Sequence, residues 1–264
     1  MKIHKKSLAR SCRKWLPVLL LMMVTTVRGD DKPIIIAHRG ASKAAPENTA
    51  ASIQRAVEMG AKVIEIDVRK TKDGELVLFH DKELDRLTGR KGTIEELDFE
   101  SARQLDVGSW FGDSFSEEKP ITLAEAIEQC RKGGAITLVE HKTGDAASYA
   151  EVIKELKAEK DVIVQSFNWT FLSGFRKRLP GIPIGALGSK KLSDHLEAIT
   201  ELQPEWVGWK FSDLTAENLE TLHGLDFRVA LWTVNDPGEA KKWIERGIDG
   251  IITDVPDVML RLAE

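Results

Sequence analysis

The sequence predicts an α/β protein, a TIM-type (β/α)8 barrel with a small insertion after the second strand. Apolar β-runs alternate with amphipathic helical segments along the chain. The length of 264 residues suits one barrel domain of about 250 residues. A doubly wound sheet would stop at about five or six strands and open with a glycine-rich turn, which is missing here. Eight parallel strands are predicted, at residues 34–37, 63–68, 135–141, 162–167, 182–186, 206–211, 228–234 and 250–253.

Residues 1–29 have the composition of an export signal. Residues 1–14 carry six basic side chains and no acidic one, and residues 15–27 are almost entirely apolar. That apolar run is short for a spanning helix, which needs about 20 residues. We predict a secretory signal cleaved after Gly29 and a periplasmic or secreted barrel domain of residues 30–264, with an uncleaved anchor as the alternative.

The exported chain is acidic. Without residues 1–29 the basic residues fall from 38 to 31, against 42 acidic ones. Affinity for nucleic acid comes from Lys and Arg on phosphates, so a nucleic-acid partner is not expected. Nor is a stable membrane partner expected once the signal is removed. The mature chain keeps one cysteine, Cys130, and so forms no internal disulfide.

Residues 63–81 predict the second barrel strand followed by a hairpin. Strand alternation places Glu65 and Asp67 on one face. An Asp-Gly pair then signals a tight turn into an apolar return run, residues 76–80. With a two-residue turn, the register sets Asp67 opposite His80, about 5 Å apart between Cβ atoms.

Residues 82–121 interrupt the βα rhythm, because their apolar side chains are spread among charges and glycines. We interpret them as the insertion, covering one side of the barrel mouth. Asp254 is interpreted as the cap of the last helix, which starts at Pro256. Helices are predicted near residues 50–57, 123–131, 149–157, 170–178, 193–200, 216–223, 237–246 and 256–262.

Titratable residues gather where the first three barrel strands end, which is where working groups lie in such barrels. They are His38, Arg39, Glu65, Asp67, Glu140 and Lys142, joined by His80 from the return run. Unpaired charges are costly in a barrel interior. The clustering therefore favours a functional site over a solvated hairpin.

These groups sort by chemistry. Three are carboxylates with no cysteine nearby: Glu65, Asp67 and Glu140. Such a set suits Mg²⁺ or Ca²⁺, with salt bridges to Arg39 and Lys142 as the alternative. Arg39 and Lys142 suit a phosphate, and His38 and His80 suit a general acid and base.

Aromatic residues at later strand ends are candidate walls for an apolar part of a substrate, with core packing as an equal alternative. They are Phe167, Phe211 and Trp232. His141 lies between two inward positions of its strand. We interpret it as structural, with its side chain toward the helices.

The chain resembles the glycerophosphodiester phosphodiesterase family over nearly all of its mature length. The motifs that carry the resemblance, in the family's order, are His38-Arg39-Gly40, Pro46-Glu47-Asn48-Thr49, Glu65-Ile66-Asp67-Val68, Asp73-Gly74 leading to His80-Asp81, Glu140-His141-Lys142, Gln165-Ser166-Phe167, Trp232-Thr233-Val234-Asn235 and Thr253-Asp254. His141 departs from the pattern, since the family more often has an aliphatic residue there.

The resemblance implies hydrolysis of glycerophosphodiesters to glycerol 3-phosphate and an alcohol, at a divalent metal on the three carboxylates. It implies that His38 and His80 are the acid and base, with Arg39 and Lys142 near the phosphate. One alternative is a lysophospholipase D-like enzyme on lipid substrates, which an open apolar rim from residues 110–115 would favour. The other is a non-catalytic binding barrel, which would have lost a histidine or a carboxylate, and none is missing.

Overall fold

The computed structural model describes residues 32–264, and the segment interpreted as a signal lies outside these residues. Within them, eight parallel strands close into a barrel, because the first strand pairs with both the last and the second. The fold prediction is therefore confirmed. The barrel strands are β1 (Ile34–Ala37), β2 (Val63–Lys70), β4 (Ile136–His141), β5 (Val162–Ser166), β6 (Ile184–Gly188), β7 (Trp206–Lys210), β8 (Arg228–Trp232) and β9 (Gly250–Thr253). The additional strand β3 (Leu76–Leu78) pairs antiparallel with β2.

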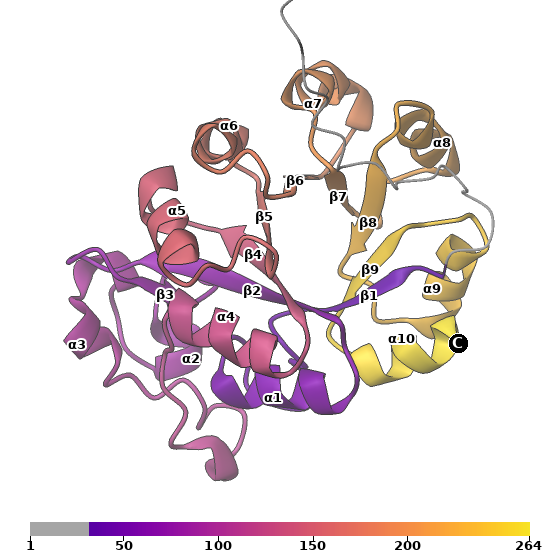
Figure 1. Cartoon of the computed structure of the whole chain (residues 1–264). Coiled ribbons are helices and arrows are strands. Elements are labelled where there is room, and N and C mark those ends of the chain that lie inside the picture. Colours follow the sequence, from indigo (N-terminus) through magenta and orange to yellow (C-terminus); the bar gives the residue numbers. More distant parts are fainter. Residues whose placement is uncertain (1–31) are drawn as a thin grey trace, which may run out of the picture. The chain divides into compact units, whose positions relative to one another are not determined.

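Helices follow the barrel strands and surround the sheet (Figure 1). They are α1 (Ala50–Glu58), α2 (Asp85–Thr88), α3 (Phe99–Ala102), α4 (Leu123–Lys132), α5 (Ala146–Glu155), α6 (Trp169–Arg178), α7 (Leu196–Leu202), α8 (Ala216–Gly224), α9 (Pro237–Ile244) and α10 (Pro256–Ala263). The start of α5 is earlier than predicted, because the Asp145 carboxylate accepts from the N–H groups of Ala147 and Ser148 and caps the helix there. None of the helices in residues 32–264 has the length and apolar character needed to cross a bilayer.

The barrel interior is apolar at one end and charged at the other. Small and branched side chains fill its middle, namely Ile36, Val63, Leu138, Ala230 and Ile252. Further along the same faces come Glu65 and Asp67 of β2 and Glu140 of β4. The parallel register pairs Asp67 with Glu140, so both carboxylates emerge at the same level. The carboxyl ends of these strands thus carry the site.

The hairpin β2–β3 has a different register from the predicted one. Val68 pairs with Leu78, and the Thr71 N–H donates to the Glu75 carbonyl at 2.8 Å, which leaves three residues in the turn. Gly74 adopts φ +107° there. Asp67 therefore faces Phe79, and the prediction that it faces His80 across the ladder is wrong.

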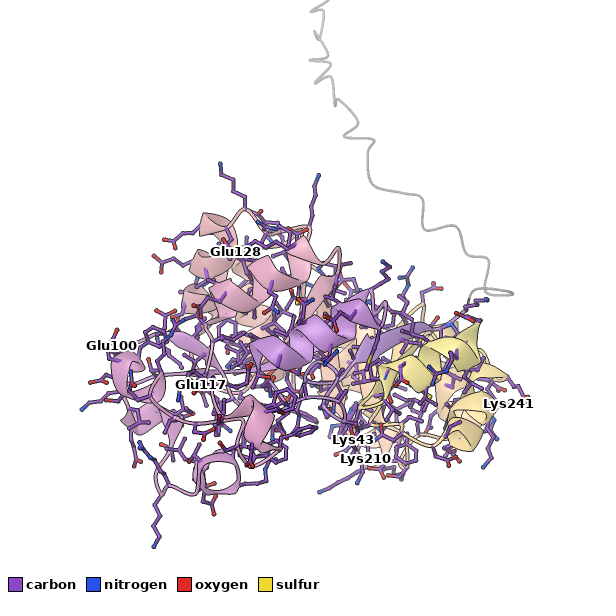
Figure 2. The ribbon with its side chains drawn as sticks, turned by 90° about the horizontal axis from the view of Figure 1, so that it is seen from below. Lys43, Glu100, Glu117, Glu128, Lys210 and Lys241 are labelled. Carbon is purple, nitrogen blue, oxygen red and sulfur yellow. The ribbon has the colours of Figure 1, made fainter. Side chains whose placement is uncertain are left out.

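Residues 82–121 contain α2, α3 and two short 3-10 helices, and they lie beside β3 (Figure 1). They enclose a hydrophobic cluster of their own with β3, made of Val77, Phe79, Leu84, Leu87, Ile94, Ala102, Leu105 and Val107. Ten acidic and six basic residues lie in this segment. Glu100 and Glu117, labelled in Figure 2, are among its exposed acidic side chains. Its excess of acid offers no general surface for phosphate.

Candidate active site

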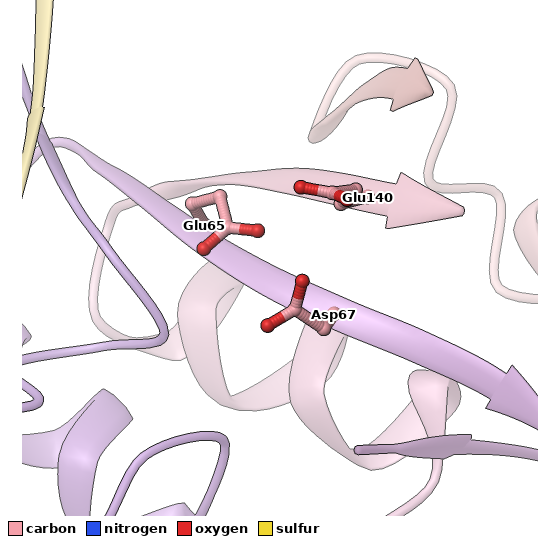
Figure 3. A group of neighbouring side chains, drawn as sticks. All are labelled: Glu65, Asp67 and Glu140. Atoms are coloured by element: carbon pink, nitrogen blue, oxygen red, sulfur yellow. The ribbon is translucent and has the colours of Figure 1, made fainter. Parts of the chain in front are cut away.

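Three carboxylates meet at the carboxyl ends of β2 and β4 (Figure 3). Glu65, Asp67 and Glu140 are all buried, and one oxygen of each lies within 4.8 Å of the others. Glu65 and Asp67 share a face of β2 because strand side chains alternate, and Glu140 is the register partner of Asp67 on the neighbouring strand. The spacing is that of ligands around one small cation.

Two cations face these carboxylates. Lys142 Nζ lies 3.0 Å from Asp67 Oδ1 and also contacts Glu140, and Arg39 Nε lies 3.1 Å from Asp67 Oδ2. The salt-bridge alternative is thus realised at Asp67 and Glu140. One carboxylate oxygen of Glu65 has no partner in this arrangement. Glu65 Oε2 accepts from the backbone N–H of Arg39 at 2.9 Å, while the buried Oε1 has no hydrogen-bond partner among the described residues.

Burial and mutual repulsion shift the pKa values of the three acids in different directions, depending on their neighbours. Burial, then the charges of Asp67 and Glu140, raise the pKa of Glu65 well above its ordinary value. Burial and Asp67 raise the pKa of Glu140 to about 7. At Asp67 burial acts in the same direction, but Lys142 and Arg39 outweigh it and hold the pKa below the ordinary value. Three ionised carboxylates would exceed the charge of the two cations, and this excess adds to burial in raising the pKa values of Glu65 and Glu140.

The loop before α1 supports the site through two residues to which sequence reasoning gave no role. Asn48 Nδ2 donates to Asp67 Oδ2 at 2.9 Å, and its Oδ1 accepts from the Asp67 N–H at 2.9 Å. Glu47 accepts from Arg39 Nη1 at 2.8 Å. Both belong to the Pro-Glu-Asn-Thr motif, which was the available signal for them.

His38, at the end of β1, is held by Asp254. Its Nδ1 lies 2.6 Å from Asp254 Oδ1, and Ser42 Oγ donates to the same oxygen at 3.0 Å. Asn235 Nδ2 donates to Oδ2 at 2.6 Å. Burial would raise the pKa of Asp254, but the hydrogen bond and charge of His38 lower it to about 2.

The interpretation of Asp254 as a helix cap is wrong. The cap residue of α10 is Val255, and no side chain caps that helix. The Asp254 carboxylate is turned instead toward a histidine that lies 216 positions earlier. Asp254 is therefore a site residue, although its local sequence pattern predicted a helix cap.

His80 reaches the same cavity by a different route from the one predicted. Strand β3 ends at Leu78, so ladder alternation no longer sets the direction of His80. Arg69 donates to the His80 carbonyl at 3.0 and 3.1 Å, and His80 Nδ1 lies 2.7 Å from Asp81 Oδ1. Burial lowers the pKa of His80, although the charge of Asp67 opposes this.

One cavity joins most of these groups. The charged and titratable residues that line it are His38, Arg39, Glu65, His80, Glu140 and Lys142. Phe167 and Trp232 also line it, with ring centroids 5.5 Å apart, and Phe167 is 50% exposed. Gln165 is a further polar lining residue.

Phe211 is not among the residues that line this cavity, and its packing supports the alternative of a core role. It has the same parity as Val207 and Trp209, which pack outward against the helices, and it lies half-buried against their cluster. His141 is outward as predicted. Its ring stacks on Phe171 with centroids 3.6 Å apart, and its Nδ1 lies 3.0 Å from Ser166 Oγ.

The strand ends of the closed barrel bring carboxylates, cations and two imidazoles to one cavity. This arrangement is that of a (β/α)8-barrel enzyme with a small-molecule site. Residues 38–258 match the Glycerophosphoryl diester phosphodiesterase family, and the chain belongs to that family.

Relatives and solved structures agree with this assignment. The chain is 34% identical over 237 residues to the glycerophosphodiester phosphodiesterase of Caldanaerobacter subterraneus subsp. tengcongensis, covering 88% of this chain and 98% of the relative. A phosphodiesterase from Oleispira antarctica, solved with the product sn-glycerol-3-phosphate, superposes with a TM-score of 0.84 at 32% identity, covering 88% and 96% of the two chains. The glycerophosphodiester phosphodiesterase of Thermotoga maritima superposes at 0.72 with 27% identity, covering 89% and 100%.

Proposed function

We propose that this chain hydrolyses glycerophosphodiesters to sn-glycerol 3-phosphate and an alcohol, using His38 and His80 as acid and base. One observation carries the proposal. Two imidazoles, each tied through Nδ1 to its own carboxylate, line the cavity that also holds the acidic trio. Because Nδ1 is engaged, Nε2 of each ring is left to take or give a proton at the substrate.

The proposal includes a Ca²⁺ or Mg²⁺ ion held by Glu65, Asp67 and Glu140. The residues fit such an ion, because all three ligands are oxygens and Glu65 Oε1 is a buried acceptor without a hydrogen bond among the described residues. When bound, the ion supplies charge neutralisation at the phosphoryl oxygens. A ligand role for Glu65 also explains why a raised pKa is tolerated there, since a cation replaces the proton.

The chain's own cations act on the phosphodiester. Arg39 presents a planar donor fork and Lys142 a point charge, and both line the cavity. They bind the anion and stabilise the charge that develops on it in the transition state. One histidine deprotonates the nucleophile and the other protonates the departing alkoxide. If water is the nucleophile, glycerol 3-phosphate forms directly; if it is the glycerol 2-hydroxyl, a cyclic phosphate forms first and water then opens it to glycerol 3-phosphate. Phe167 and Trp232 pack against the glycerol carbons.

Release of glycerol 3-phosphate from a panel of glycerophosphodiesters tests this function. We expect turnover with the untreated enzyme, loss of activity after chelation, and recovery with Ca²⁺ or Mg²⁺. Variant E65Q, which keeps the side chain's shape, should need far more metal for recovery. Absence of glycerol 3-phosphate from every substrate, with the metal present and the protein folded, would contradict the proposal.

A lipid-bearing substrate is the second candidate, and the exposed ring of Phe167 at the cavity favours it. Trp110 in the insertion is 41% exposed as well. Adding a lysophospholipid to the panel separates the two, because a lysophospholipase D-like enzyme releases a lysophosphatidate from it and not glycerol 3-phosphate. If neither product forms, the barrel is a binding protein.

The assignment of residues 1–29 as an export signal is likewise proposed. We also propose that residues 30–264 form the exported domain and residues 82–121 its insertion. N-terminal sequencing of the protein recovered outside the cytoplasm tests this assignment, and a mature chain that begins directly after Gly29 is the expected result.

A further inference from the structure

Arg86 is a charged residue of the insertion that does not line the cavity, yet it is bonded to two carboxylates beside it. It lies on the short helix α2. Its Nη1 and Nη2 donate to the two oxygens of Glu47 at 2.9 and 2.7 Å, and its Nε donates to Asp81. One guanidinium therefore spans the loop before α1 and the end of the hairpin.

Each of these carboxylates holds a residue of the site. Asp81 Oδ1 lies 2.7 Å from His80 Nδ1, and Arg86 takes the other oxygen of the same carboxylate. Glu47 Oε1 accepts from Arg39 Nη1 at 2.8 Å. Arg86 is thus one carboxylate away from the proposed acid or base and one carboxylate away from a proposed phosphate ligand.

The setting differs from that of an ordinary surface ion pair, which contributes little to stability because both partners are solvated. The Glu47 side chain is only 9% exposed, although Arg86 itself is 43% exposed. The fork is bidentate, which fixes direction as well as distance. Arg86 Cζ lies over the Trp110 ring, 5.8 Å from its centroid.

We propose that Arg86 is a positioning residue for His80, through which the insertion completes the active site. Arg86 binds Asp81 Oδ2 and thereby keeps Oδ1 of the same carboxylate on Nδ1 of His80. The proton then stays on Nδ1, and Nε2 faces the substrate. This inference rests on the proposed function, because it assigns His80 a part in catalysis. The variant R86Q removes the charge and the Nε donor to Asp81, so the aspartate loses its orientation.

Arg103 provides a matched control. It also belongs to the insertion, and its side chain is 42% exposed. It donates from Nη2 to Glu125 at 2.6 Å, a residue of α4 that does not line the cavity. A change of Arg103 to Gln removes a comparable ion pair from the same segment without touching the carboxylates beside His80.

The experiment compares R86Q, R86K and R103Q in the full-length enzyme with its metal. With glycerophosphocholine as substrate, R86Q should lower kcat by about 10- to 100-fold with KM changed less than about threefold. R103Q should keep kcat within about twofold, with a similar melting temperature. R86K should recover part of the loss, since ammonium restores charge without the fork.

A nitrogen-15 histidine spectrum supplies a readout that needs no substrate. The His80 signal is assigned by its disappearance in H80A. It should show the proton on Nδ1 in the wild type and R103Q, and a mixed or altered tautomer in R86Q. An R86Q enzyme with kcat equal to that of R103Q overturns the proposal, as does a loss confined to KM.

Failure of the proposed function is a distinct outcome. If the wild-type protein releases no glycerol 3-phosphate, that proposal falls, and the histidine spectrum alone decides the role of Arg86. An unchanged His80 tautomer in R86Q then overturns the inference, and a changed one supports it.

Discussion

His38 and His80 are held by the same kind of contact from different parts of the molecule. Each imidazole has Nδ1 on a carboxylate, at 2.6 Å for Asp254 and 2.7 Å for Asp81. Asp254 follows β9 and is tied to loops that follow β1 and β8, through Ser42 and Asn235. The His38 contact is therefore a product of barrel closure.

The His80 contact depends on segments outside the barrel. Asp81 follows the extra strand β3, and its second oxygen is held by Arg86 of the insertion. The cluster that supports this region is a separate, smaller one formed by β3 and the insertion. The barrel thus supplies one imidazole with its support, and an added hairpin with its insertion supplies the other. The two histidines should respond differently when their surroundings are altered.

Removal of the imidazoles themselves should have the largest effect. H38A and H80A should each lower kcat by about 10²- to 10⁴-fold, because each loses one proton transfer, while the fold and metal binding remain. Their rates on glycerophosphocholine and on a substrate with a p-nitrophenyl leaving group give the comparison. The histidine that protonates the leaving group is the one whose loss matters less with p-nitrophenol, which needs no proton to depart.

His195 offers a control for these two variants, since it packs between the rings of Trp169 and Trp209 and does not line the cavity. H195A should keep kcat near the wild-type value. Near-normal turnover in either H38A or H80A would show that the corresponding imidazole takes no part in the reaction.

The carboxylates behind the imidazoles should give the next largest effect. D254N and D81N keep the side chain's shape but turn one acceptor oxygen into a donor. At Asp254 three donors converge, so the new NH₂ must oppose one of them. We expect about 10- to 100-fold in kcat for both variants, and about 1–2 kcal/mol of lost stability for D254N by urea unfolding. If D81N loses as much stability as D254N, the claim that only the His38 contact is part of the barrel's own stability is contradicted.

The Asp254 variant should also change the acid sensitivity of the fold. The pKa of Asp254 is lowered from 3.8 to about 2, so its ionised form stabilises the folded state above about pH 4, and this contribution is lost as pH falls toward 2. It amounts to about 1 kcal/mol once solvent screening of this part-exposed group is allowed for. Between pH 4 and 2 the stability of D254N should therefore fall less steeply than that of the wild type.

The barrel half of this comparison was largely predictable from sequence. The strands β1 and β9 begin and end at the predicted residues, since buried parallel strands read as short unbroken apolar runs. The placement of Glu65 and Asp67 on the mouth follows from alternation alone. These features depend on local pattern, and local pattern is visible in a sequence.

The supports of the imidazoles were not predictable in the same way. An aspartate two positions before a proline has the local pattern of a helix cap, and only the closed barrel shows that Asp254 meets His38. The hairpin register depends on a side chain: Thr71 Oγ1 accepts from the Glu75 N–H at 2.9 Å and donates to Asp73 at 2.5 Å, which favours a three-residue turn over the shorter one. Long-range polar contacts of this kind have no periodic signal.

The smallest predicted effect is that of a substitution at this turn. It tests whether the turn or the insertion positions His80. Gly74 adopts φ +107°, and a Cβ there would have only Lys70 Cε nearby, at 3.7 Å. The cost of G74A is therefore one of backbone conformation, about 1 kcal/mol of stability. Gly181 is the control, because its φ is ordinary and an added Cβ meets no atom within 4 Å. If Asp81 and the insertion hold His80, kcat of G74A should stay within about threefold of that of G181A. A tenfold loss at equal folded fraction would show instead that the turn sets the position of the imidazole, since the change then travels along β3 to its end.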